Sequence, residues 1–143
     1  MPPDASPGPP AFEEVDHTAD RAIVARGASL EELFENAARG MNAILGFRPD
    51  PGAAPEARRI ALEAVDAEGL LVSWLSELAF LAETESLGFE RFGFERFSPT
   101  ALAATAFGRK AAAMEKLIKA VTYHDLAIRR EGGIYTARIV FDV

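Results

Sequence analysis

The chain has 143 residues, of which 49% are hydrophobic and 26% charged, and its formal net charge is −7 at pH 7. This length and composition are typical of one globular domain, and no stretch reaches the roughly 18 apolar residues that a membrane span needs. The absence of cysteine excludes disulfides and thiolate sites, and the acidic balance argues against a chain that binds RNA phosphates directly, unless a local patch departs from the total.

The first ten residues contain five prolines but no lysine, arginine or apolar segment. This composition predicts a disordered leader over 1–10, not a secretory signal, and a single domain over 11–143. With no export signal, we expect a cytoplasmic location and no membrane partner. Two short apolar segments at 12–15 and 22–26 predict strands on either side of the motif DHTAD at 16–20.

The clearest helix signals lie in the first third of the chain. Ser29 and Glu32 have the spacing of a capping box, in which each side chain accepts from a backbone N–H of the first turn. Apolar residues then recur every three or four positions, as in an amphipathic helix; they are Leu30, Leu33, Phe34, Ala37, Met41, Ile44 and Leu45. Gly46 is suited to end this helix, and Pro49 and Pro51 forbid its continuation.

A strand and a second helix are predicted next. Residues 58–65 alternate between apolar and polar side chains, as a half-buried strand does. Asp66 is placed as the N-cap of a helix that continues to about Ala82, with the apolar stripe Leu70, Leu71, Trp74, Leu75, Leu78 and Leu81. Within that stripe we interpret Trp74 as an anchor of the core.

The pentapeptide GFERF occurs twice in tandem, at 88–92 and 93–97. An odd period cannot hold one face in a regular strand, so Phe89 and Phe97 are predicted on one side and Phe92 and Phe94 on the other. We therefore expect a sheet whose two faces are both partly covered.

The last third of the chain is predicted to be mostly strand. Residues 101–107 read as a strand, whereas 109–116 have helix-forming composition in a segment too short to settle. Strands over 117–129 and 134–143 are joined by a glycine-rich turn at 131–133. The fold class is therefore α+β, with two amphipathic helices packed on a largely antiparallel β-sheet system.

Carboxylates gather at the ends of the predicted strands. Asp20 follows Asp16 by four residues, and Asp142 stands beside Val143, whose free carboxylate adds a further anion. If the first and last strands are neighbours, these oxygens suit a hard divalent cation such as calcium, magnesium or manganese. The alternative is that Asp16 and Asp20 cap a turn and Asp142 is solvated, and residue types alone favour this second interpretation.

The sequence offers few residues for other kinds of metal or catalytic site. His17 and His124 are the only histidines, too few for a usual zinc site, and each fits a structural, hydrogen-bonded role better than that of a ligand or base. No phosphate-binding glycine loop or nucleophile motif is present. Lys119, within 117–129, either extends its ammonium group from an edge strand or offers a cation beside the acidic cluster.

Taken together, five segments resemble the archease family. They are DHTAD, GASLEELFENAARGM at 27–41, LLVSWLSELAFL at 70–81, IKAVTYHDL at 118–126 and the terminal FDV. The resemblance covers 12–143 in order, and it implies an archease-like fold.

In function, the resemblance implies a protein cofactor and not an enzyme. Archeases assist the GTP- and metal-dependent tRNA-splicing RNA ligase, which joins 3′-phosphate or 2′,3′-cyclic phosphate ends to 5′-hydroxyl ends, by promoting its guanylylation and multiple turnover. The resemblance further implies that Asp20, Asp142 and Val143 bind a divalent cation, calcium in crystals, and that Lys119 carries the activation role. RNA would then reach this chain only through the ligase.

The residues leave some assignments open. Asp16, His17 and His124 are candidates to surround the metal ligands. Residues 108–117 (GRKAAAMEKL) are shorter and more basic than the polar loop typical of archeases, which puts any contact made by that loop in question. Two other functions stay in view: a metal-dependent phosphoester hydrolase that uses the same carboxylates, and a general chaperone-like interaction module.

Overall fold

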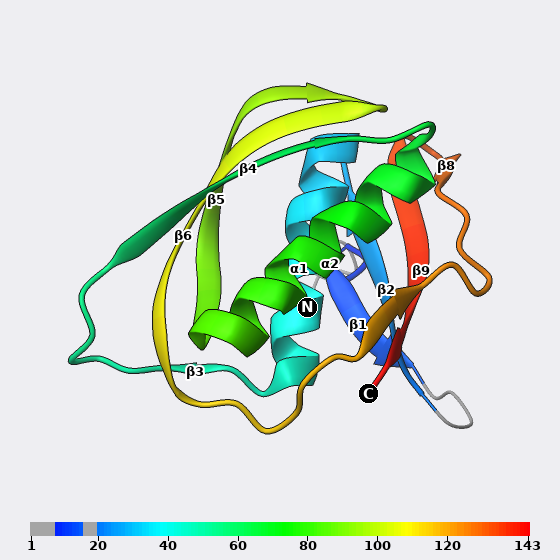
Figure 1. The fold of residues 1–143 in the computed structure, drawn as a ribbon. Coiled ribbons are helices and arrows are strands. Elements are labelled where there is room, and N and C mark those ends of the chain that lie inside the picture. Colours follow the sequence, from blue (N-terminus) through cyan, green and yellow to red (C-terminus); the bar gives the residue numbers. More distant parts are fainter. Residues whose placement is uncertain (1–7, 16–19) are drawn as a thin grey trace, which may run out of the picture.

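The computed structural model describes residues 8–15 and 20–143 (Figure 1). Most of the predicted leader, together with Asp16 and His17, therefore lies outside the described residues. Along the chain, the elements are β1 (Phe12–Val15), β2 (Arg21–Gly27), α1 (Leu30–Leu45), β3 (Arg48–Pro49), β4 (Glu56–Glu63), α2 (Ala67–Glu85), β5 (Leu87–Ser98), β6 (Ala101–Ala113), β7 (Ala120–Thr122), β8 (Arg129–Glu131) and β9 (Ile134–Asp142). In this described part, no helix has the length and apolar character needed to cross a membrane.

Both predicted helices are confirmed, together with their caps. Ser29 Oγ accepts from the Glu32 N–H at 3.1 Å, and Glu32 Oε1 accepts from the N–H of Ala28 at 3.0 Å, which secures the start of α1. Gly46 ends this helix in the left-handed conformation, with φ of 63°. Asp66 caps α2 by accepting from the Gly69 N–H at 2.7 Å, and α2 runs slightly beyond its predicted end.

The strands form two antiparallel sheets with the helices between them (Figure 1). The first sheet has the order β1-β2-β9-β7, with β8 also paired to β9. In the second sheet, β6 pairs with β4 and β5, and its far end pairs with β3. α1 contacts β2 and β5, and α2 contacts β5 and β7, so each helix covers both sheets. The predicted α+β class is confirmed.

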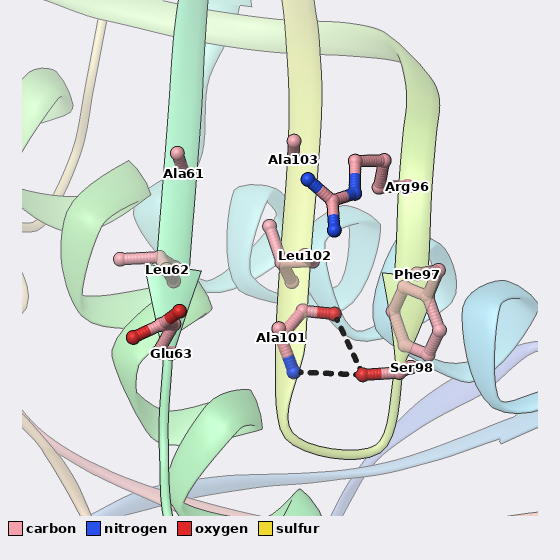
Figure 2. Close-up of a pocket in the computed structure, with 9 residues that line it drawn as sticks. All are labelled: Ala61, Leu62, Glu63, Arg96, Phe97, Ser98, Ala101, Leu102 and Ala103. Carbon is pink, nitrogen blue, oxygen red and sulfur yellow. Dashed lines mark hydrogen bonds between the residues drawn. The ribbon is translucent and has the colours of Figure 1, made fainter.

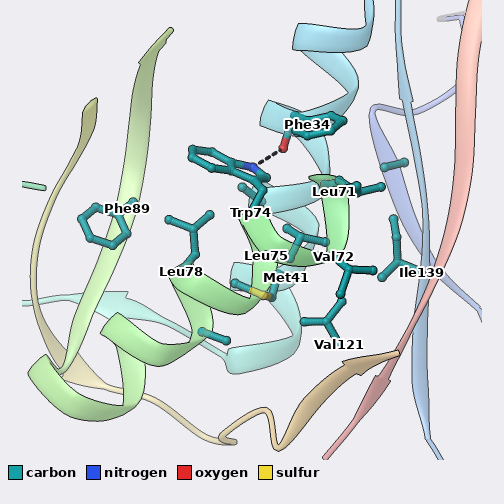
Figure 3. Packing of buried hydrophobic residues seen from close by; sticks show 14 of the residues in the cluster. Phe34, Met41, Leu71, Val72, Trp74, Leu75, Leu78, Phe89, Val121 and Ile139 are labelled. Carbon is teal, nitrogen blue, oxygen red and sulfur yellow. Dashed lines mark hydrogen bonds between the residues drawn. The ribbon is translucent and has the colours of Figure 1, made fainter. Parts of the chain in front are cut away.

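Trp74 anchors the core between the helices and the second sheet, as predicted. Its side chain is 0% exposed, and its indole N–H donates to the carbonyl oxygen of Phe34 at 3.0 Å (Figure 3). The rings of Phe92 and Phe94 lie 5.5 Å and 5.3 Å from the indole, the first edge-on and the second tilted, and both arrangements favour aromatic pairs.

The prediction that the GFERF repeat divides its phenylalanines between two faces is wrong. β5 carries a β-bulge in each repeat, where the register to β6 skips Glu90 and then Glu95. Each bulge absorbs one residue, so the five-residue repeat advances only four positions along β6. The four phenylalanines at 89, 92, 94 and 97 consequently oppose alternate β6 residues, namely Gly108, Ala106, Ala104 and Leu102, and all face the core.

In the last third of the chain, the structure decides one assignment that the sequence left open and shows that one prediction is wrong. Residues 109–116 are not helical, because β6 continues to Ala113 through pairing with Leu87 of β5 and with β3. Residues 117–129 are not one strand either: a turn closed by the Leu126 N–H to the Tyr123 carbonyl, with Asp125 at φ of 55°, separates β7 from β8. The glycine turn before β9 is confirmed, with φ of 58° and 80° at residues 132 and 133.

Candidate functional site

The order of the first sheet brings distant parts of the sequence to the end of β9. Arg21 pairs with Phe141, so one residue beyond this register Asp20 stands opposite Asp142. On the other side of β9, the Lys119 N–H donates to the Asp142 carbonyl at 2.8 Å. In Figure 1 the carboxyl end of the chain accordingly lies beside the beginning of β7. Three residues singled out in the sequence therefore meet at one strand end.

Successive side chains of β9 point to opposite faces of the sheet, and this decides which of them are exposed at the strand end. Phe141 is 0% exposed and faces the helices, which turns the neighbouring Asp142 side chain to the surface. Val121 of β7 pairs with Phe141 and is also buried against α2 (Figure 3). Val143 is half-buried and packs against the core. The strand end is thus anchored by apolar residues while its carboxylate remains accessible.

Lys119 lies just outside β7, not within a long strand. The prediction that it lies within a strand is wrong, because pairing begins only at Ala120 and Lys119 occupies a bend. Its side chain is exposed, and the hydrogen bond of its own N–H holds its backbone against β9. Both interpretations of Lys119 agree with an exposed side chain, so its role stays a prediction.

The structure does not bring His124 to this strand end. It lies beyond the other end of β7, in the turn that starts at Tyr123, and its Nε2 is 3.3 Å from Asp125 Oδ2. Asp16 and His17 flank Asp20 in sequence but fall outside the described residues.

The donors at this site are oxygens. By strand register, Asp20 stands opposite Asp142, and Val143 follows in sequence. Their carboxylate and main-chain oxygens are donors that suit hard cations such as calcium or magnesium better than zinc. Within 8–15 and 20–143 there is no group of three or more histidine, aspartate or glutamate side chains able to hold a metal. A cation here would therefore depend on main-chain and water oxygens as well, as calcium commonly does.

A second surface feature escaped the sequence reasoning. The outer face of β4, β5 and β6 carries an open depression of about 680 Å³, floored by alanines and flanked by Glu63 and Arg96 (Figure 2). The arginine in each GFERF repeat was visible in the sequence. Its position on the outer face was not, because the two bulges that orient these arginines depend on pairing with β6.

Comparison with known proteins points to one family. The model of the Archease protein family matches residues 12–143. Protein archease of Methanosarcina barkeri is 38% identical over 141 residues, covering 92% of this chain and 95% of the relative.

Two solved structures share the fold. A crystal structure from Thermotoga maritima, described as an archease and possible chaperone, superposes with a TM-score of 0.69 at 26% identity, covering 92% of this chain and 96% of that one. A solution structure from Methanobacterium thermoautotrophicum gives 0.65 at 34% identity, covering 93% and 99%. The chain therefore belongs to the archease family.

Proposed function

We propose that this chain is a protein cofactor of the tRNA-splicing RNA ligase, acting in tRNA splicing or RNA repair in the cytoplasm. It would promote guanylylation of the ligase with GTP and support repeated turnover, without catalysing a reaction of its own. Membership of the archease family supports the class of function. The observation that carries the proposal is the meeting of Lys119 and Asp142 at the end of β9.

Each residue has a distinct part in this proposal. Asp20, Asp142 and the main-chain oxygens of Val143 would hold a divalent cation: calcium, magnesium or manganese. When bound, the cation would neutralise carboxylates that otherwise repel one another. The backbone bond between Lys119 and Asp142 holds the Lys119 backbone at this strand end, so its exposed side chain would offer the ligase a cation on an otherwise acidic protein.

The proposal is tested with the cognate ligase and substoichiometric amounts of this chain. We expect faster single-turnover guanylylation and continued ligation after the first turnover. Lys119→Ala should lose the effect, whereas Lys116→Ala, which removes another exposed lysine of the same segment, should retain it. No acceleration by the wild-type protein over a wide concentration range would refute the proposal.

A chaperone-like role is the second candidate, because the Thermotoga maritima relative is described as a possible chaperone. It predicts that the chain keeps unrelated unfolded proteins soluble and that Lys119→Ala does so equally well. A metal-dependent hydrolase, by contrast, would turn over RNA, nucleotides or phosphoesters with no ligase present, which the proposed function excludes.

A further inference from the structure

The two bulges of β5 sort the charges on the outer face of the second sheet. The glutamate skipped in each repeat pairs with an arginine: Glu90 lies 3.7 Å from Arg109, and Glu95 lies 3.6 Å from Arg59. Glu95 also accepts a hydrogen bond from the Thr105 hydroxyl at 2.8 Å. These glutamates are therefore already engaged with neighbouring strands.

The arginine of each repeat is left without such a partner. Arg91 and Arg96 are exposed, and neither makes an ion pair within the described part of the chain. Arg91 lies over the ring of Phe107, with its guanidinium carbon 4.0 Å from the ring centroid. The repeat thus presents two uncompensated cations, one of them as a plane stacked on an aromatic ring.

Between these cations the outer face carries Thr105 and the Glu95–Arg59 ion pair, and an open depression lies beyond Arg96. Arg91 and Arg96 oppose Phe107 and Ala103, four residues apart along β6, or roughly 13 Å at the rise of a strand. The depression of about 680 Å³ begins at Arg96, whose guanidinium leans toward the central strand, and Glu63 stands on its other side (Figure 2). Its floor includes Ala61, Ala101 and Ala103, which allow a ligand to approach the sheet closely.

We propose that this outer face binds a short stretch of single-stranded RNA. Guanidinium groups bind phosphates in bidentate fashion, and the free plane of Arg91 offers a stacking surface for an unpaired base. The Glu63 carboxylate can accept from an exocyclic amino group of a base, which an acidic protein partner would not offer. This inference goes beyond the proposed function, and it departs from the expectation, implied by the archease resemblance, that RNA reaches the chain only through the ligase.

The test measures RNA binding by the full chain without ligase, using a fluorescent single-stranded oligoribonucleotide of mixed sequence at low ionic strength. We expect weak binding. The logarithm of the association constant should fall linearly with the logarithm of the salt concentration, with a slope of about −1.4 for two neutralised phosphates. Arg91→Ala/Arg96→Ala should weaken binding about tenfold or more. Arg129→Ala/Arg130→Ala is the matched control, because it removes two exposed arginines from β8, one of them also stacked on an aromatic ring.

Three results would overturn the inference: no binding by the wild type, equal weakening in both double variants, or a wild-type dimer that only the first double variant dissociates. The last result would identify the face as an interface between copies. Because the ligase is absent, a failure here is independent of any result on guanylylation.

Discussion

Two single-residue deletions in β5 should differ sharply in their effect on stability. Deleting Glu90 removes a bulge but leaves Phe89, Arg91 and Phe92 opposite Gly108, Phe107 and Ala106 in a regular ladder, so every phenylalanine stays in the core. The loss is one half-exposed ion pair to Arg109, worth about 0–1 kcal/mol.

Deleting Gly93 has the opposite consequence. The ladder then slips by one residue at Phe94, which turns outward, and the next bulge restores the register of Phe97 only by bringing Glu95 into the ladder with its side chain toward the core. Phe94 is partly buried, so we take the low end of side-chain burial, about 1.5 kcal/mol, and its ring contacts with Trp74 at 5.3 Å and Phe97 at 5.4 Å add about 0.5–1.5 kcal/mol each. Turning the Glu95 carboxylate toward the core without a partner costs about 1–3 kcal/mol more. The total of about 3.5–7.5 kcal/mol is a large part of the stability of a typical domain.

Urea unfolding followed by far-ultraviolet circular dichroism and tryptophan fluorescence gives both values. The glutamate deletion should unfold near the wild-type midpoint, and the glycine deletion should unfold at much lower urea or fail to fold. Equal destabilisation by the two deletions, or a wild-type midpoint after the glycine deletion, would show that the bulges do not set the faces of β5.

Two further predictions concern charge. Calcium at one hundred times its dissociation constant should raise the free energy of unfolding by about 2.7 kcal/mol. Asp20→Asn or Asp142→Asn should abolish this gain, whereas Glu131→Gln, which changes an exposed acid on β8, should keep it. An undiminished gain in both aspartate variants would contradict the proposed site. The hydrogen bond from Arg58, at 2.6 Å, lowers the pKa of Glu85 from its ordinary value of 4.5, so its contribution is complete above that pH and is lost as pH falls through the lowered pKa. Acid titration of Glu85→Gln should show a weaker loss of stability below pH 4.5 than the wild type, and parallel curves would refute the role of this pair.

Local signals predicted the helices because caps and helical periodicity act within a few residues. Ser29, Gly46 and Asp66 end or begin helices through contacts with the adjacent turn. The GFERF repeat misled because its bulges exist only in register with β6. Residues 109–116 likewise have helix-forming composition, and pairing with β5 and β3 overrides it.

The candidate site was predictable only in part, for the same reason. Asp20 and Asp142 stood out as carboxylates near strand ends, but their approach depends on β2 and β9 being neighbours. That Lys119 joins them through its backbone depends on β7 pairing with the far side of β9. Such non-local pairings leave no periodic pattern in a single sequence.

The most direct test of the central claim is the single-turnover rate of ligase guanylylation with GTP, measured with no added protein, with the wild-type chain, and with Lys119→Ala. Circular dichroism establishes that the variant is folded, as expected for an exposed side chain at a bend. The account predicts acceleration by the wild type and none by Lys119→Ala. Equal acceleration by both proteins, or none by either, would contradict it.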